Sequence, residues 1–226
     1  MHFYATLQEQ TQAERDYLLA APIIGRALRG EVGLDSYLAF LAQAYHHVKH
    51  TVPLLMACGA RLPERLEWLR GAIAEYIEEE YRHQEWILND IRACGGDAAA
   101  VRNGTPNLPT ELMVGYVYDR IARANPVSFF GMVNVLEGTS IALATQAAGR
   151  IRDSLDLPAQ AFSYLTSHGS LDLEHIELFK GLMNRLEDAD DQAAVVHTAR
   201  VVYRLYGDMF RSLPLGAAQE SRHATA

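Results

Sequence analysis

Hydrophobic residues recur every three to four positions along most of the chain, which is the spacing of an amphipathic α-helix. No stretch alternates between apolar and polar residues as a half-buried β-strand does. The pattern predicts about seven main helices, at residues 6–20, 35–58, 63–94, 110–125, 126–155, from 158 onward, and 193–213. Because short connections join them, we predict one all-α domain over residues 1–213 and a flexible tail at 214–226.

Proline and glycine mark where these helices bend or end. Pro53 is expected to kink the helix at 35–58, because proline removes a backbone donor and clashes with the preceding turn. Pro63 lies near the favoured first position of a long helix that continues to about residue 94. Residues 97–109 are rich in Gly, Asn and Pro and are expected to form a loop.

Composition and charge narrow the functional classes. The chain has 226 residues, of which 20 are basic and 28 acidic, and a net charge of -8 argues against a nucleic-acid binder. Its two cysteines, Cys58 and Cys94, indicate a reduced intracellular setting without a disulfide framework. No apolar run approaches the ~18 residues that a membrane span needs. We therefore expect a soluble cytoplasmic protein with no membrane partner.

The most informative stretch carries two histidines and an aspartate. His168, Asp172 and His175 fall at i, i+4 and i+7, so they share one face of the predicted helix. Leu165 and Phe179 continue the same stripe, which places the three polar groups in an apolar seam. Burial without partners would cost roughly 2–7 kcal/mol per group. A divalent metal ion would satisfy such a set, and a hydrogen-bonded Asp–His pair in the core is the alternative.

A second pair lies on the predicted helix at 63–94. Glu80 and His83 form an E-x2-H unit within a stripe that is otherwise apolar. Such a unit alone arises by chance in any Glu-rich helix, but its position inside an apolar stripe favours a pair of metal ligands. Glu79 belongs to a charged stripe and is expected to be solvated.

Glu137 is the third indication. It is the only acidic residue between Asp119 and Asp153, and it lies in a helix that is hydrophobic nearly all round. Such a helix is buried, and an unpaired buried glutamate is costly. Metal coordination would offset that cost, and the alternatives are a protonated glutamate or one paired with an arginine.

Three histidines precede Pro53. His46, His47 and His50 could supply a further ligand or could simply form a polar face. We place His47 tentatively ahead because its stripe includes the apolar Phe40 and Leu54.

The number of candidate ligands is itself informative. Three carboxylates and three imidazoles are too many for one catalytic ion that keeps an open position, and they suit two ions with bridging carboxylates. Nitrogen and oxygen donors without thiolate favour iron or manganese over a structural zinc site. These six residues are Glu80, His83, Glu137, His168, Asp172 and His175.

Two di-metal helical scaffolds use such ligands. The ferritin-like bundle takes a Glu from each of two helices and Glu-x-x-His from the other two, which leaves His168 surplus. The order E-x2-H, a lone buried Glu, then H-x3-D-x2-H more closely resembles the heme-oxygenase-like diiron oxidases, over most of the chain. Thiaminase II (TenA-like proteins) and the pyrroloquinoline-quinone synthase group share that scaffold. The family's early-helix carboxylate is absent here, because His46, His47 and His50 stand in its place.

The resemblance implies a heme-oxygenase-like helical bundle that activates O2 at two iron ions and oxidises a small organic substrate. Family reactions act on amines, amino acids and fatty acids. Tyr76 and Tyr164, one turn from ligands, would line the pocket or serve as ordinary core aromatics. Alternatives are a metal-free cofactor-handling or heme-degrading enzyme on this scaffold, and a non-enzymatic binding module. We also expect a homodimer, and no thiaminase activity, because neither cysteine lies in a matching context.

Overall fold

The computed structural model describes residues 2–216, except for the side chains of residues 168–175. This part of the chain is helical and contains no strand, which confirms the all-α prediction. The α-helices are α1 (Phe3–Gln10), α2 (Gln12–Leu19), α3 (Pro22–Leu28), α4 (Leu34–Val48), α5 (Thr51–Arg61), α6 (Glu67–Glu80), α7 (His83–Ala93), α8 (Ala98–Asn103), α9 (Leu108–Arg123), α10 (Phe129–Leu155), α11 (Ser163–Asn184) and α12 (Ala189–Ser212). Short 3-10 turns are η1 (Glu64–Leu66), η2 (Pro126–Ser128) and η3 (Ala159–Phe162).

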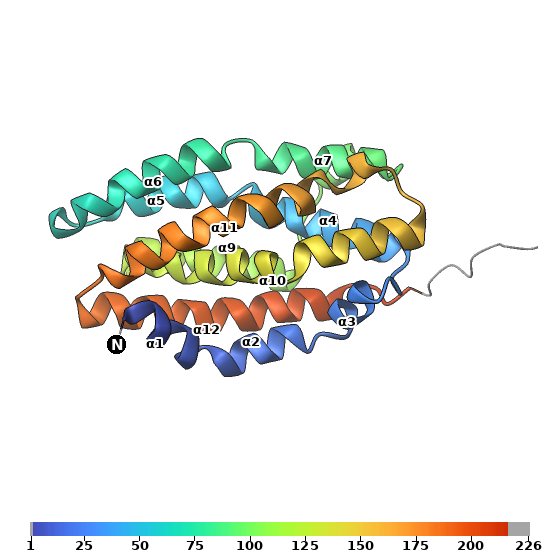
Figure 1. Ribbon diagram of the computed structural model, residues 1–226. Helices are drawn as coiled ribbons and strands as arrows, with labels where there is room; N and C mark the ends of the chain where they lie inside the picture. The colour runs from blue at the N-terminus through green and yellow to red at the C-terminus, as the bar shows by residue number, and fades with distance from the viewer. Residues whose placement is uncertain (1, 217–226) are drawn as a thin grey trace, which may run out of the picture.

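The three longest helices, α10, α11 and α12, form the centre of an elongated bundle (Figure 1). Helix α10 packs against both α11 and α12, and α12 also packs against α2 and α9. Helices α4 with α7, and α5 with α6, form further packed pairs. Figure 1 shows these pairs along one side of the bundle and α1 to α3 along the other side.

Helix α10 begins deep in the core. Its first seven residues, from Phe129 to Val135, are all buried, as expected for a helix that is apolar nearly all round. Gly131 permits a close approach to α12, because an added Cβ would lie 2.5 Å from the Val195 carbonyl oxygen and 2.7 Å from the Ala199 nitrogen. The buried amide of Asn134 accepts a hydrogen bond from Gln8 at 2.8 Å.

Residues Pro126–Leu155 are long and apolar enough, by length and composition, to cross a membrane. This differs from the expectation that no run approaches the required length. Most of the apolar window, 61%, is buried inside the protein, as in the core helix of a globular bundle. The apolar character of α10 is therefore accounted for by its packing against α11 and α12.

Three of the seven predicted helices are each broken into two, and the short helices α3 and α8 complete the set from α1 to α12. The predicted helix at 6–20 divides at Thr11 between α1 and α2. The helix at 35–58 divides at Lys49 and His50, before Pro53. Proline clashes with the carbonyl four residues earlier, so the helix ends one turn sooner, and Pro53 lies in the first turn of α5, where no donor is needed.

The third break has no proline or glycine to mark it. The expected uninterrupted helix from Pro63 ends as α6 at Glu80 and resumes as α7 at His83. Between them Tyr81 is extended and Arg82 is left-handed, with φ of 74°. Such a conformation costs a residue with a Cβ about 1–2 kcal/mol. The expected loop at 97–109 also contains the short helix α8, whose N-cap Asp97 accepts hydrogen bonds from two backbone amides.

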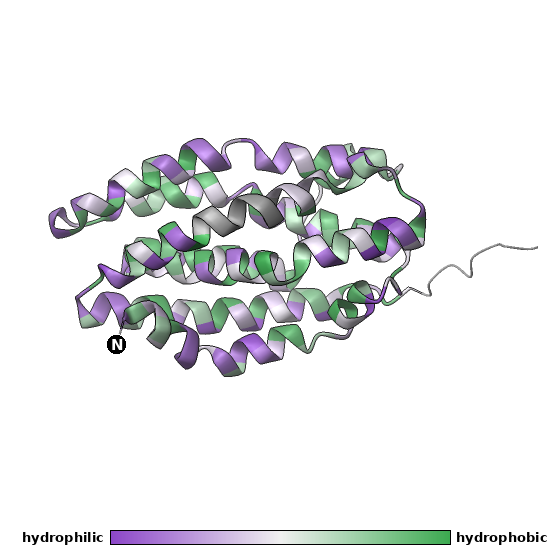
Figure 2. Cartoon of the chain, in the orientation of Figure 1, coloured by the Kyte–Doolittle hydropathy of each residue, from purple (hydrophilic) through white to green (hydrophobic). Residues whose placement is uncertain are grey.

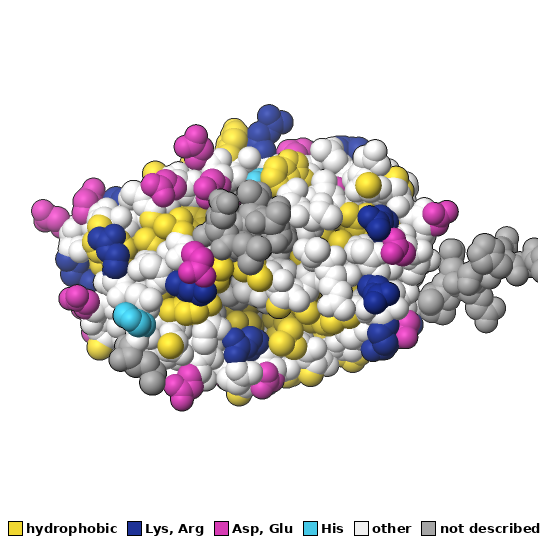
Figure 3. All heavy atoms as spheres, in the orientation of Figure 1, with side chains coloured by type: hydrophobic (Ala, Val, Ile, Leu, Met, Phe, Trp, Pro, Cys, Tyr) yellow, Lys and Arg dark blue, Asp and Glu magenta, His cyan; other side chains and the backbone are white. Residues whose placement is uncertain are grey.

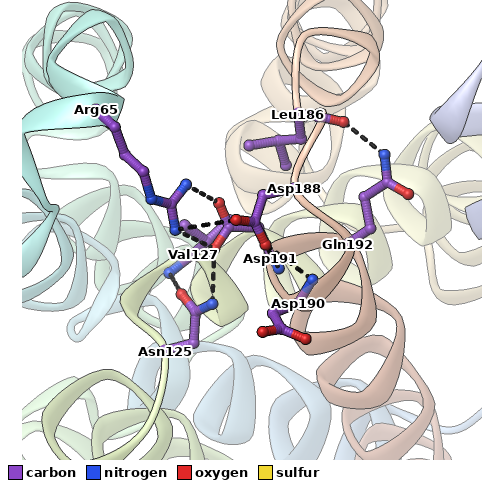
Figure 4. Close-up of polar contacts among 8 residues, drawn as sticks. All are labelled: Arg65, Asn125, Val127, Leu186, Asp188, Asp190, Asp191 and Gln192. Carbon is purple, nitrogen blue, oxygen red and sulfur yellow. Dashed lines mark hydrogen bonds and ion pairs between the residues drawn. The ribbon is translucent and has the colours of Figure 1, made fainter.

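A buried carboxylate joins three segments at one end of the bundle (Figure 4). Asp191, in the first turn of α12, accepts hydrogen bonds from Arg65 at 2.6 and 3.0 Å and from Asn125 at 2.8 Å. Asn125 in turn caps η2 by accepting from the Val127 amide. Asp188 is the N-cap of α12. The contact thus fixes α12 to the connections before α6 and α10.

Polar and apolar residues divide along the helices. In Figure 2, hydrophobic residues recur along α10 and α12, whereas hydrophilic residues gather around the break between α6 and α7. On the face shown in Figure 3, acidic and basic side chains are interspersed, with hydrophobic side chains between them. The described residues of this face therefore form no continuous basic stripe.

The segment after α12 is held at its beginning. The Pro214 carbonyl accepts a hydrogen bond from the Ser36 hydroxyl at 2.7 Å. The carbonyls of Leu215 and Gly216 accept from the Arg26 guanidinium. The rest of the predicted tail, residues 217–226, lies outside the described residues.

Candidate metal centre

Glu80 and His83 come together across the break between α6 and α7. Glu80 is the last residue of α6 and His83 the first of α7, and both are buried. The Nδ1 of His83 lies 3.1 Å from a carboxylate oxygen of Glu80. The E-x2-H spacing was predicted on a single helical face, and the structure instead brings the two side chains together through the turn at Tyr81 and Arg82. The His83 ring also stacks on Trp86, with ring centroids 3.9 Å apart.

Glu137 approaches the end of α6 from α10. It is half-buried, and it lines the same cavity as Glu80 and Tyr76. Burial raises the pKa of Tyr76, and the negative charges of Glu137, Glu79 and Glu80 raise it further, with a hydrogen bond from the hydroxyl to Glu137. As expected, Glu79 is exposed.

The histidines of α4 and its C-terminal connection differ in where they lie. His47 is buried, lines the cavity beside Glu80 and Glu137, and packs edge-on against Tyr206 at 5.6 Å between centroids. His46 is buried away from the cavity lining, next to Lys49, and burial lowers the pKa of its imidazole to about 4, with Lys49 adding to the effect. His50 contacts the Tyr118 hydroxyl at 3.2 Å. Of the three, His47 is therefore the one that faces the cavity.

The remaining predicted ligands are on α11. The side chains of His168, Asp172 and His175 lie outside the described residues. Helix α11, which carries them, packs against α10 and α7.

The start of α11 is anchored by a residue that sequence reasoning missed. Asp90 on α7 is buried and accepts hydrogen bonds from the backbone amides of Ser163 at 3.1 Å and Tyr164 at 2.9 Å, and from the Ser163 hydroxyl. It therefore acts as a cap supplied by another helix. The sequence did contain a signal for a buried role. Asp90 follows His83 by seven residues, which is about two helical turns, and the apolar Ile87 and Ile91 lie beside it.

The cavity at this site has a volume of about 160 Å³ and is bordered mainly by α3, α4, α5 and α10. Tyr76 and Tyr164, for which both pocket and core positions were considered, line it. Its polar wall also contains Glu80, Glu137 and His47, and the greater part of the rest is aliphatic or aromatic. Among the described residues that line it there is no lysine or arginine.

The donor set fits a cation. Two carboxylates border a mainly apolar cavity, and ionised carboxylates are costly there unless positive charge compensates them. The Tyr76 hydroxyl lies beside Glu137 and the His83 imidazole beside Glu80, and neither group carries a fixed positive charge. No group of three or more His, Cys, Asp or Glu that could hold a metal occurs among the described side chains. The other three members of the predicted set lie outside them.

Comparison with known proteins agrees with this architecture. A domain of unknown function with a heme oxygenase-like fold from Shewanella denitrificans is similar, with a TM-score of 0.81, 23% identity, and coverage of 92% of this chain and 90% of that one. A TenA homolog from Pseudomonas syringae pv. tomato has a TM-score of 0.75 at 10% identity, covering 92% and 90%. Heme oxygenase-1 from the cyanobacterium Synechocystis, in complex with heme, is similar with a TM-score of 0.73 and 13% identity. The likeness covers 93% of this chain and 91% of that one.

These likenesses establish a heme oxygenase-like fold. A search of curated proteins finds no match. The family described as "Iron-containing redox enzyme" matches residues 38–207, which extend from the second turn of α4 to within α12. Because the match covers most of the chain, this protein belongs to the family of iron-containing redox enzymes with a heme oxygenase-like fold.

Proposed function

We propose that this chain is a non-heme oxidase or oxygenase that holds two iron ions and uses O2 to oxidise a small organic substrate. Manganese is the alternative metal. The proposed ligands are Glu80, His83, Glu137, His168, Asp172 and His175, with His47 as a further, tentative one. The observation that carries the proposal is that Glu80, Glu137 and His47 share the wall of one mainly apolar cavity whose described lining has no lysine or arginine.

Each side chain has a role that follows from its chemistry. The carboxylates of Glu80 and Glu137 supply the negative charge that compensates a cation, and neutral imidazoles such as His83 supply nitrogen donors. The Tyr76 hydroxyl lies beside Glu137 on the cavity wall, within the influence of its charge. The apolar wall keeps water out, which strengthens electrostatic interactions inside the cavity. Iron, when bound, supplies the one-electron and O2 chemistry that side chains lack.

A heme-degrading activity on the same scaffold is less well supported. His47 faces the cavity and could approach a heme iron, but the two carboxylates beside it would then have no evident role. The described lining also offers no lysine or arginine for the heme propionates. One fold accommodates many functions, so the likeness to a heme oxygenase does not outweigh the residues at the site.

A cysteine-dependent activity on a TenA-like scaffold is also less well supported. Burial raises the pKa of Cys58 to about 12, and its thiol donates to the Pro126 carbonyl. Burial, followed by the charge of Asp90, raises the pKa of Cys94 to about 11. Because the thiolate is the nucleophile, both groups are poorly suited to attack. Neither borders the cavity.

The proposal is tested by metal content and oxygen uptake of the full chain produced with added iron. The variants Glu137→Gln and His175→Ala should each lose iron while keeping the helical circular-dichroism spectrum. Loss of a residue that merely orients a ligand typically lowers metal affinity about 10–100-fold, and loss of a ligand should cost more.

Matched controls are Glu79→Gln and His197→Ala, which alter an exposed acid beside the site and an exposed histidine on α12. Both should keep the wild-type iron content. Wild-type protein without iron would favour a non-enzymatic binding module, and unchanged iron in Glu137→Gln would remove Glu137 from the ligand set. The homodimeric state and the cytoplasmic location remain predictions from the sequence.

A further inference from the structure

The imidazole of His83 lies at the start of a helix, where the backbone does little to fix its orientation. Inside an α-helix the preceding turn restricts the rotamer of each side chain. His83 is the first residue of α7, and the two residues before it, Tyr81 and Arg82, are extended and left-handed. Figure 1 shows α6 and α7 as separate helices joined by this short connection. The plane of the His83 ring therefore depends mainly on the side chains that it contacts.

Two contacts of this ring differ in kind. At its edge, Nδ1 lies 3.1 Å from a carboxylate oxygen of Glu80. Across its face lies the indole of Trp86, with 3.9 Å between ring centroids and 27° between ring planes. The edge contact directs one nitrogen, but alone it still allows the ring to tilt. The contact with the face of Trp86 opposes that tilt.

Trp86 is placed for this contact by the helix itself. It follows His83 by three residues in α7, and residues three apart in a helix lie on the same face. The Trp86 side chain is only partly buried, whereas His83 is 3% exposed. Rings stacked at this distance leave no room for water between them. Trp86 therefore covers one face of the buried imidazole and also reaches the surface.

From this stacked geometry at the start of α7, we propose that Trp86 is a positioning residue for the metal centre, whose indole holds the plane of His83 so that Nδ1 stays directed toward Glu80. Partners that orient a ligand typically affect metal affinity about 10–100-fold. Trp86 is not itself a ligand, because the indole nitrogen is a donor only. The inference rests on the proposed function, in which Glu80 and His83 hold iron.

The second tryptophan of the chain provides a matched control. Trp68 on α6 is also partly exposed and also stacks on a side chain, the guanidinium of Arg185, at 4.0 Å. Trp68 and Glu80 lie near opposite ends of α6, about 18 Å apart along its axis. The same substitution at both tryptophans therefore compares the loss of a stack beside a proposed ligand with the loss of one far from it.

Metal affinity provides the first test. The full chain, freed of metal by chelation, would be titrated with Co²⁺, a divalent ion that accepts the same nitrogen and oxygen donors as iron. Trp86→Leu should bind Co²⁺ about 10-fold or more weakly than wild type. Trp86→Phe, which restores a flat ring, should recover most of that loss, and Trp68→Leu should match wild type. Equal affinity in Trp86→Leu and wild type would overturn the inference, as would an equal loss in Trp86→Phe or Trp68→Leu.

Tryptophan fluorescence provides the second test. The chain has two tryptophans, so Trp68→Phe leaves only Trp86, and Trp86→Phe leaves only Trp68. Because Trp86 stacks on a proposed ligand and quenching falls steeply with distance, bound Co²⁺ should quench the emission of Trp68→Phe strongly and that of Trp86→Phe little. Unchanged emission from Trp68→Phe that has bound Co²⁺ would overturn the inference. This pair decides if Trp86→Leu does not fold.

The inference and the proposed function fail in different ways. Wild-type protein that binds no Co²⁺ and holds no iron when produced with it would contradict both. Wild-type protein that binds Co²⁺, with an affinity and an emission that do not depend on Trp86, would overturn the inference alone and leave the proposed metal centre in place.

Discussion

At the scale of single residues, Arg82 is one of two described non-glycine residues, with Asp156, whose φ is positive. It is left-handed, at φ of 74°, between two helices that each end in a proposed ligand. We expect Arg82→Val to lower the free energy of unfolding by about 1–2 kcal/mol, because a β-branched side chain tolerates this region poorly. Arg82→Gly should be neutral or slightly stabilising.

Arg92 is the control for this prediction, because it is an exposed arginine inside α7 with ordinary helical geometry. There glycine should destabilise by about 0.5–1 kcal/mol relative to other residues. Chemical denaturation measures all of these variants. A loss of stability in Arg82→Gly as large as that in Arg92→Gly would contradict the assigned backbone strain.

His47 leads to a prediction about metal occupancy. An imidazole in place of a carboxylate leaves one less negative charge beside a cation, so the second iron position should be only partly filled in wild-type protein. His47→Glu should raise iron content toward two per chain, as measured by elemental analysis. His46→Glu and His50→Glu should not, because neither side chain lines the cavity. A response at all three, or at none, would show that His47 is not a ligand.

Sequence reasoning chose Glu80, His83 and Glu137 because each is a polar group that interrupts an apolar stripe. In the structure Glu80 lies 3.1 Å from His83 and lines the same cavity as Glu137, and their role as metal ligands stays a prediction. The sequence alone could not distinguish His47 from His46 and His50. Which of them faces the cavity depends on the rotation of the helix about its axis, and tertiary packing sets that rotation. Asp90 was missed, because its role lies in the amides of another helix, far away in sequence.

At the scale of elements, the contact between α10 and α12 depends on the absence of a side chain at Gly131. An added methyl group would meet backbone atoms of α12, which cannot move as a flexible side chain can. Gly131→Ala should therefore lower the free energy of unfolding by about 1–3 kcal/mol. Gly149→Ala on the same helix, where a Cβ has open space, should instead raise it by roughly 0.5–1 kcal/mol. Thermal and chemical unfolding would reveal whether both changes have the same sign, which would contradict this account.

Helix positions followed from periodicity, but helix breaks did so only in part. Pro53 predicted a kink in this helix. Because proline clashes with the preceding turn, the break lies at Lys49 and His50. The breaks at Thr11 and Arg82 have no such marker, since the apolar stripe continues through both. Packing must offset the local cost at these positions, and a single sequence does not reveal packing.

At the scale of the whole molecule, Asp191 connects segments that are 126 residues apart in sequence through Arg65. Burial alone would raise the pKa of Asp191, but hydrogen bonds from Arg65 and Asn125 outweigh it and hold the pKa below its ordinary value. A lowered pKa in the folded state means that this stabilisation is present above about pH 4 and is lost as pH falls through the folded-state pKa.

Asp191→Asn should therefore be less stable than wild type by about 1–3 kcal/mol at neutral pH, and the difference should shrink below about pH 4. The control is Asp190→Asn, which changes an exposed neighbour in the same turn. Urea denaturation across this pH range gives the free energies. A difference that is constant with pH would mean that the carboxylate charge at Asp191 does not stabilise the fold.

The fold class followed from the sequence because every level agreed: the helical period, the turn residues and the apolar content all favour a helical bundle. The shape of the cavity was not predicted. Its wall is built from α3, α4, α5 and α10 together, and the shape of the space between helices depends on their relative positions.

The mainly apolar cavity between the helices also has a consequence for stability. Closed, empty cavities in protein cores cost about 24 cal/mol per Å³, so a cavity of about 160 Å³ would cost at most about 4 kcal/mol, against the 5–15 kcal/mol typical of domains. Substitutions that fill the cavity with apolar side chains should therefore stabilise this protein. A screen for heat resistance alone would select them, and the most durable variants would be those that no longer admit a substrate.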